Sequence, residues 1–232
     1  MAAQTGTKHV LSQKALLKCM AMHLLLIPTR QSKLLSKRTL DCLLQIKLEW
    51  TDHSVSLSQN GQIESMKQKF NECDSKRDFT TPMETKLKLT NGDLNNIPDV
   101  PYRELVCSLL FIARCTRPDI SFAVTLLVRF LTNYTEAHLK AETWVLCYTA
   151  STTDRVLLYN RNLKAPVLEF HTYLDWGSDE IDGRSTYGVL LLVCGIPVAW
   201  SAGKRTHVAL SKSEAEYIAN TSRFRKPNTS LT

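Results

Sequence analysis

The sequence predicts an α+β fold in which a compact helical unit is followed by a β-rich segment, and two observations lead to this expectation. Across residues 102–148, apolar side chains recur with helical spacing in three successive stretches joined by short turns. After residue 155 the period changes to that of strands, and β-branched and aromatic residues become frequent. Such a change of period indicates two structural units, which would meet near residues 151–164.

A β-hairpin and a helix are predicted before the helical unit. Residues 40–50 and 54–58 alternate apolar and polar side chains around a Thr-Asp-His turn, which is typical of a hairpin. In the stretch that follows, the spacing of Ile63, Met66 and Phe70 places all three on one face of a helix. This face is expected to be buried.

Three helices are predicted to form the helical unit. The first spans residues 102–114, and Pro118 suits the first turn of the second, which would run to about Leu131. Thr135 is a suitable N-cap for the third helix. The stretch before them, residues 74–100, is poor in large apolar residues and rich in turn formers, so a linker or a long surface loop is expected there.

Strands and a final helix are predicted in the β-rich segment. The strands would span residues 155–160, 167–176, 186–194 and 197–201. A capping-box sequence, Ser211-Lys212-Ser213-Glu214, opens a helix that would reach about Thr221. The polar tail after this helix is expected to be disordered.

The net charge of +7 suggests a nucleic-acid partner, but its distribution weakens the suggestion. Residues 1–50 hold eight Lys/Arg against two acidic residues, a net charge of +6, and the rest of the chain has a net charge of +1. The excess therefore lies in a basic leader, which the pattern interprets as one or two amphipathic helices.

The cysteines and the hydropathy pattern indicate an intracellular protein of the cytoplasm or nucleus. Seven scattered cysteines, none spaced as Cys-x-x-Cys, argue against a disulfide framework and a zinc site and favour a reducing compartment. The apolar run at residues 19–27 is shorter than the about 20 residues that a membrane span needs, and no small-x-small cleavage site follows it. Neither a membrane partner nor secretion is expected.

A series of short motifs gives a more specific indication. They are TTPME at 80–84, PYRELVCSLL at 101–110, CTRPDI at 115–120, HLKA at 138–141, VLCY at 145–148, DW at 175–176, DGRST at 182–186, AWS at 199–201, VALS at 208–211 and EAEYIA at 214–219. In order and spacing they closely resemble copia-type LTR retrotransposon Pol polyproteins. Any one motif is weak evidence, but so many in register are specific.

The resemblance implies the end of a reverse transcriptase followed by the start of an RNase H domain. The expected divisions are a leader at 1–37, a hairpin and helix at 38–73, a linker at 74–100, a helical thumb- or connection-like unit at 101–160, a partial RNase H-like domain with one helix at 165–222 and a tail at 223–232. The parent family copies element RNA into DNA and degrades the RNA strand. RNA–DNA hybrid or DNA would therefore be the partner, and Mg²⁺ the metal.

Most of the catalytic carboxylates that the resemblance implies are missing from this sequence. The Tyr-x-Asp-Asp turn of the polymerase does not occur in it and would lie before Leu40. In the RNase H-like domain, the acid expected on the first strand is replaced by Tyr173. Asp175 lies on the same strand face but about 6–7 Å further along, so it could replace this magnesium ligand only if the strand slipped.

Glu216 matches the acid that the family carries on the first helix, which makes it the best candidate for a catalytic and magnesium-binding residue. Without the resemblance it would be interpreted as a solvated residue of a helix surface. Glu214, two positions earlier, faces elsewhere around the helix and belongs to the capping box. Two further acids are expected after the helix, beyond Thr232.

Arg117 and Arg184 are candidate nucleic-acid contacts, each with a structural alternative. Arg117 precedes Pro118 and could instead fix the turn between two helices, and Arg184 could lie at a strand edge. Trp176 and Trp200 are expected in the core, with base stacking as the alternative.

Three functional hypotheses follow: a non-catalytic remnant of Pol, a nucleic-acid-binding module without catalysis, and a truncated piece of an active enzyme. Cys107 stands where the family commonly has glycine, Trp144 where a basic residue is usual, and Ser151 at a turn glycine. Together with Tyr173, these replacements favour the remnant, for which no magnesium-dependent cleavage of a hybrid is expected.

Overall fold

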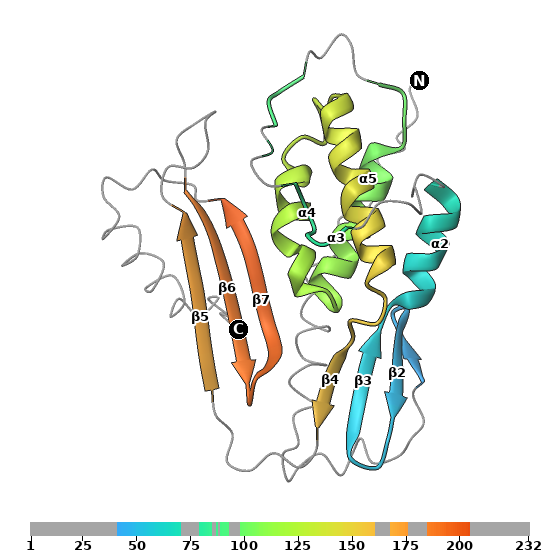
Figure 1. Ribbon diagram of the computed structural model, residues 1–232, viewed down its shortest axis with the longest axis vertical. Coiled ribbons are helices and arrows are strands. Elements are labelled where there is room, and N and C mark those ends of the chain that lie inside the picture. Colours follow the sequence, from blue (N-terminus) through green and yellow to red (C-terminus); the bar gives the residue numbers. More distant parts are fainter. Residues whose placement is uncertain are drawn as a thin grey trace, which may run out of the picture.

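A computed structural model describes residues 41–70, 79–84, 87, 89–92, 98–160, 168–175 and 185–204. These residues form two antiparallel sheets and a group of helices, so the predicted α+β class is confirmed. Figure 1 shows the helices above the first sheet, with the second sheet beside them. In the described part of the chain, no helix is long and apolar enough to cross a membrane.

The first sheet has four strands in the order β1-β2-β3-β4. They are β1 (Cys42–Leu43), β2 (Ile46–Trp50), β3 (Ser54–Ser58) and β4 (Leu157–Asn160). The predicted hairpin is confirmed, because β2 and β3 pair antiparallel with Lys47 opposite Ser58. The alternation of buried and exposed residues along β2 explains the pairing, since one face of the strand lies on the core.

The first predicted strand, residues 40–50, is divided by a turn. Leu44 and Gln45 both have a positive φ, 52° and 63°, and the chain reverses there to form the short pair β1 and β2. A two-residue hairpin turn of this twist requires positive φ at both central residues. The turn could not be predicted, because neither position carries the glycine, asparagine or aspartate that such turns favour.

β4 completes the first sheet from a distant part of the chain. It pairs antiparallel with β3, and Val55 lies opposite Tyr159. The buried face of the sheet is formed by Ile46, Leu48, Val55, Leu57, Leu157 and Tyr159. Two segments that were predicted as separate units, 38–73 and 101–160, thus share one sheet.

The helices pack into one core beside this sheet. They are α2 (Asn60–Phe70), α3 (Tyr102–Cys115), the 3-10 turn η2 (Pro118–Ile120), α4 (Ser121–Val128) and α5 (Glu136–Ser151). On the predicted face of α2, Ile63 and Met66 are buried and Phe70 is partly buried. α3 buries apolar residues that recur along it with helical spacing. α4 ends before the predicted Leu131, because the N–H groups of Arg129 and Phe130 bond three residues back, to Leu126 and Leu127, and tighten the chain.

The second sheet is a meander of β5 (Leu168–Asp175), β6 (Thr186–Val193) and β7 (Ile196–Lys204). Cys194 and Gly195, both with positive φ, form the turn between β6 and β7. All three strands were predicted, although β7 is longer than expected. The predicted helix from Ser211 and the predicted tail lie outside the described residues.

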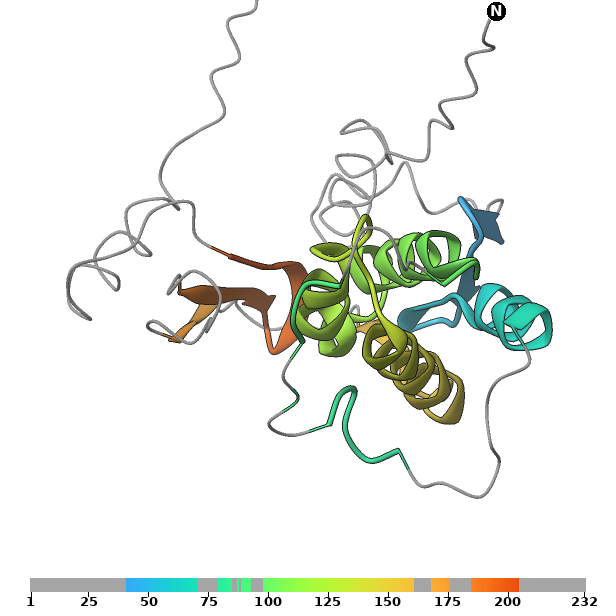
Figure 2. The same ribbon diagram turned by 90° about the horizontal axis from the view of Figure 1, so that it is seen from above.

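β7 attaches the second sheet to the rest of the protein. Val198 is 1% exposed and belongs to the same buried cluster as the first sheet. The Trp200 indole Nε1 donates a hydrogen bond to the Ala113 carbonyl of α3 at 2.7 Å, and the Tyr159 hydroxyl donates to the Pro197 carbonyl at 2.8 Å. Figure 2 shows β7 against α4 and β5 on the far side of its sheet. Trp200 is therefore part of the packing, as predicted.

Candidate functional site

The strand that would carry the first acid of an RNase H-like site is β5. Tyr173 lies opposite Gly188 of β6, and Asp175 lies opposite Thr186. Gly188 in turn lies opposite Ala202 of β7. Tyr173 is 69% exposed, so its phenol ring stands on an open surface. Among the described residues, the ladder positions beside Tyr173 therefore hold no carboxylate.

These residues do not fit a magnesium site. Mg²⁺ requires oxygen ligands close to an octahedron, mostly carboxylates and water, and a phenol hydroxyl is a poor replacement for the acid. Within the described chain, no group of three or more His, Cys, Asp or Glu side chains could hold a metal ion. Glu216 and Arg184 lie outside the described residues, so their predicted roles stay predictions.

Arg117 is held in a buried ion pair beside the 3-10 turn. Its Nε and Nη2 donate to the two carboxylate oxygens of Asp119 at 2.9 and 2.8 Å. Nη1 donates to the Thr152 carbonyl at 3.1 Å, just beyond the end of α5. The Arg117 side chain is 3% exposed. The arginine thus ties the turn before α4 to the end of α5, which is the structural alternative proposed for it from the sequence.

Tyr148 and Arg155 extend this ion pair into a network. The Tyr148 hydroxyl donates to Asp119 Oδ2 at 3.0 Å and accepts from Arg155 Nη1 at 2.6 Å. Burial by itself would raise the pKa of Asp119, but the hydrogen bonds and charge of Arg117, with the hydrogen bond from Tyr148, lower it overall. Because this bidentate pair occupies the fork of Arg117, a phosphate contact by that residue would require the pair to open.

The described residues of the predicted linker pack against α5. Phe79 lies edge-on to Trp144 with ring centroids 5.0 Å apart, and the Trp144 Nε1 donates to the Thr81 carbonyl at 2.9 Å. Further along, the Gly92 N–H donates to the Asn133 carbonyl at 2.8 Å. The segment is thus fixed to the helical unit at both ends. Its apolar residues, widely spaced among polar ones, were the only sign of this in the sequence.

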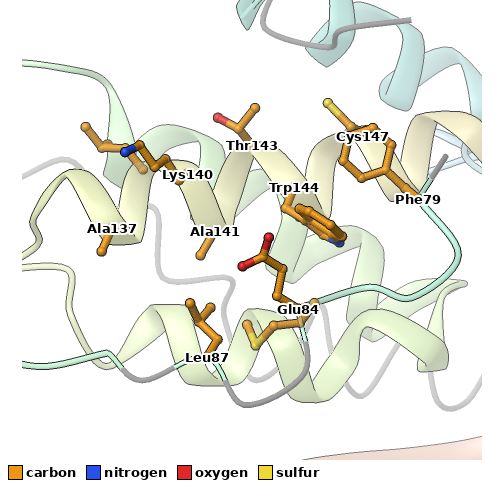
Figure 3. A pocket seen from close by; sticks show the side chains of 11 residues that line it. Phe79, Glu84, Leu87, Ala137, Lys140, Ala141, Thr143, Trp144 and Cys147 are labelled. Atoms are coloured by element: carbon orange, nitrogen blue, oxygen red, sulfur yellow. The ribbon is translucent and has the colours of Figure 1, made fainter. Parts of the chain in front are cut away.

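A cavity of about 500 Å³ lies between this segment and α5. Figure 3 shows Trp144, Ala141 and Ala137 on α5 facing Glu84 and Leu87, with the Glu84 carboxylate beside the Trp144 ring. Most of the lining is apolar, and the Trp144 donor is already used. A nucleophile paired with a base is not present among its described lining residues, so the cavity offers no evident catalytic chemistry.

His138 caps the N-terminus of α5 and lies in the core. Its Nδ1 accepts a hydrogen bond from the Thr135 N–H at 3.0 Å, so His138 fills the capping-box position that glutamate or glutamine usually occupies. The ring is fully buried, packed at 4.3 Å from the Phe130 ring, and its Nε2 has no hydrogen-bond partner. Burial lowers the pKa of His138. The predicted N-cap role of Thr135 is confirmed.

The described cysteines divide into two groups. Cys42, Cys107, Cys115 and Cys194 are not in a disulfide bond. Cys147 of α5 is disulfide-bonded, and its partner lies outside the described residues. A single bridge is not a disulfide framework, but the cysteine spacing gave no indication of it.

The described residues carry no basic excess. They contain ten Lys/Arg and thirteen Asp/Glu, a net charge of −3. The whole chain has a net charge of +7, so the remaining residues contribute +10. Electrostatic attraction of a nucleic-acid backbone would therefore have to come mainly from those remaining residues.

Comparison with known proteins finds sequence similarity to Pol polyproteins of transposons. No family model and no solved structure matches the chain. It is 35% identical over 185 residues to the retrovirus-related Pol polyprotein from transposon TNT 1-94 of Nicotiana tabacum, which covers 77% of this chain and 14% of that protein. It is 40% identical over 149 residues to the corresponding polyprotein from transposon RE1 of Arabidopsis thaliana, with 62% of this chain and 10% of that protein covered.

A shorter relative shares part of the same region. The secreted RxLR effector protein 161 of Plasmopara viticola is 35% identical over 121 residues, which cover 52% of this chain and 84% of that protein. The matches to the transposon proteins are longer and include several polyproteins. The chain spans only a small part of their length, and it belongs to the family of retrovirus-related Pol polyproteins of transposons.

Proposed function

We propose that this chain is a non-catalytic remnant of a copia-type Pol polyprotein. Residues 38–160 would correspond to the end of the reverse transcriptase, with a thumb- or connection-like helical unit. Residues 165–222 would correspond to the start of an RNase H-like domain. The parent activity is the copying of RNA into DNA and the cleavage of the RNA strand. An intracellular location, in the cytoplasm or nucleus, is part of the proposal.

The observation that carries the proposal is Tyr173. This residue stands in the middle of β5 at the position of the expected first-strand acid, and its side chain is 69% exposed. A buried tyrosine could be explained by packing, but an exposed one gives the sheet little stability. The loss of the acid therefore has no evident structural compensation, which supports loss of selection for catalysis over a change of mechanism.

The test is cleavage of a labelled RNA–DNA hybrid by the full chain with Mg²⁺. We expect no cleavage above the no-protein control. Cleavage that disappears on Glu216→Gln would contradict the proposal and would favour a truncated active enzyme. Glu214→Gln is the matched control, because it changes the same charge two residues away on the predicted helix.

The alternative of a non-catalytic nucleic-acid-binding module rests on the basic residues outside the described chain. The described residues have a net charge of −3, which does not favour binding of a nucleic-acid phosphate backbone by this part of the chain. Duplex binding that weakens steeply with salt would support this alternative. If the full chain shows no binding at low salt, the module hypothesis is wrong.

A further inference from the structure

The cavity beside α5 combines apolar walls with a carboxylate at its rim. Its volume of about 500 Å³ lies in the range of small-molecule binding sites. Ala141 and Cys147 of α5 line it and are buried, and Leu87 lines it from the segment over the helix. Glu84 also lines the cavity and is exposed to solvent. This arrangement suits a ligand that has an apolar body and one polar end near the rim.

Trp144 is held in a fixed orientation beside this carboxylate. Its Nε1 donates to the Thr81 carbonyl at 2.9 Å, and the Phe79 ring packs edge-on against it with centroids 5.0 Å apart. Figure 3 shows the Glu84 carboxylate beside the Trp144 ring. The face of an indole ring attracts a positive charge, as a carboxylate does. Because Trp144 is already held in place, a cation bound there would cost little ordering of the site.

The charged groups of the lining favour a cation at this end of the cavity. In the described part of the chain, Glu84 makes no hydrogen bond or ion pair. The indole N–H of Trp144 is used by the Thr81 carbonyl, so it is not available to an anion. Lys140 also lines the cavity, but Figure 3 shows its amine pointing toward the Ala137 end of α5, away from Trp144.

We propose that this cavity binds a small organic cation, an amine or quaternary ammonium compound with an apolar body. Its charged nitrogen lies between the Trp144 ring and the Glu84 carboxylate, and its body packs on Ala141 and Leu87. The net charge of −3 on the described residues adds a weak attraction of the same sign. The proposal concerns binding only and does not rest on the proposed loss of catalysis.

The first experiment compares three soluble probes of similar shape and different charge on the full chain. They are phenethylamine, phenethyl alcohol and hydrocinnamate, which are cationic, neutral and anionic at pH 7. Binding is followed by the tryptophan indole N–H signals in NMR spectra, and the signal that disappears in Trp144→Phe is that of Trp144. We expect phenethylamine to shift this signal and to bind about tenfold more tightly than the alcohol. Equal binding of the alcohol, tighter binding of hydrocinnamate, or no shift of the Trp144 signal would overturn the proposal.

The second experiment removes the charge at the rim. Glu84→Gln keeps the size of the side chain, and it is expected to weaken phenethylamine binding about fivefold without changing the affinity for phenethyl alcohol. Glu136→Gln is the matched control, because Glu136 is an exposed acid in the first turn of α5 that does not line the cavity. An unchanged affinity in Glu84→Gln, or an equal loss in both variants, would refute the role of Glu84. Circular dichroism of each variant checks that it is folded.

Discussion

The capping role of His138 predicts a specific dependence of stability on pH. In the native state Nδ1 accepts from the Thr135 N–H, so the ring carries its proton on Nε2 and is neutral. Protonation of Nδ1 would place a second N–H against that donor, and burial opposes the charge as well. The pKa of His138 is therefore lowered in the folded protein, with burial as the cause.

The sign of the effect follows from proton linkage. An ordinary histidine has a pKa of about 6.5, and His138 has a lower one in the folded protein, so between these two pKa values the unfolded chain binds a proton that the folded chain does not. The stabilising contribution is complete above about pH 6.5 and is lost as the pH falls from there towards the lower pKa of the folded state. Relative to pH 8, the loss at pH 5 is at most about 2 kcal/mol.

The perturbation is His138→Gln, with His138→Ala for comparison. Glutamine keeps an acceptor at this capping-box position but does not titrate, so it is expected to cost only about 1–2 kcal/mol through lost ring packing. Alanine removes the acceptor and the buried ring, and is expected to cost about 3–4 kcal/mol in total. The important quantity is the difference between wild type and His138→Gln in how steeply the free energy of unfolding changes with pH. The loss of stability at any single pH is less informative.

Urea unfolding followed by circular dichroism, repeated between pH 5 and pH 8, measures this difference. Other groups titrate in the same range, but they are common to wild type and His138→Gln. Subtracting the two free-energy curves therefore isolates His138. If the free energy of unfolding of both proteins falls by the same amount between pH 8 and pH 5, His138 is not a neutral, buried cap of α5, and the reasoning is wrong.

Three further substitutions test other parts of the packing, each by the change in urea midpoint. Gly92→Ala is expected to destabilise the protein by about 1–3 kcal/mol, because the added Cβ would lie 2.7 Å from the Thr135 Cγ2 atom and 2.9 Å from the Asn133 carbonyl oxygen. Gly61→Ala is the control and should not destabilise, because a Cβ at Gly61 meets nothing within 4 Å. Trp200→Phe is expected to cost about 1–2 kcal/mol, because the Ala113 carbonyl loses the donor that joins the second sheet to α3. Gln45→Gly is expected to stabilise by about 0.5 kcal/mol, since glycine adopts the φ of 63° without strain; an unchanged or lower midpoint would contradict this interpretation of the turn.

The sequence predicted the elements whose signals are local. The spacing of Ile63 and Met66 on α2 and the alternation along β2 each report which face of a single element is buried, and the structure agrees. The capping position of Thr135 is equally local. Such patterns arise because each element meets the same core along its whole length.

Features that depend on distant residues could not be predicted in this way. The pairing of β4 with β3 is decided by the packing of both strands on one core, and neither strand carries a mark of its partner. Arg117 shows the same limit for a side chain. Its acidic partner two residues away is visible in the sequence, but the Thr152 carbonyl that completes its burial is not. The motif therefore favoured a structural role for Arg117 at the turn but left a phosphate contact as the alternative.

At the candidate site, the sequence predicted which residue is replaced, but it did not predict what surrounds that residue. Tyr173 in place of an acid can be seen in the sequence once the resemblance is known. Its exposure, and the Gly188 that lies opposite it, depend on the register of β5 against β6. The segment over α5 was missed for a related reason, since a few widely spaced apolar residues show no period.

The closure of the first sheet by β4 also has a consequence for how the chain folds. Because Ser54 pairs with Asn160, the sheet cannot be completed until nearly the whole helical unit has been synthesised and ordered between these two residues. Contacts between such distant positions close a long loop, which slows folding. During synthesis, the β3 edge of the β2–β3 hairpin would therefore stay unpaired until β4 has emerged from the ribosome and can pair with it.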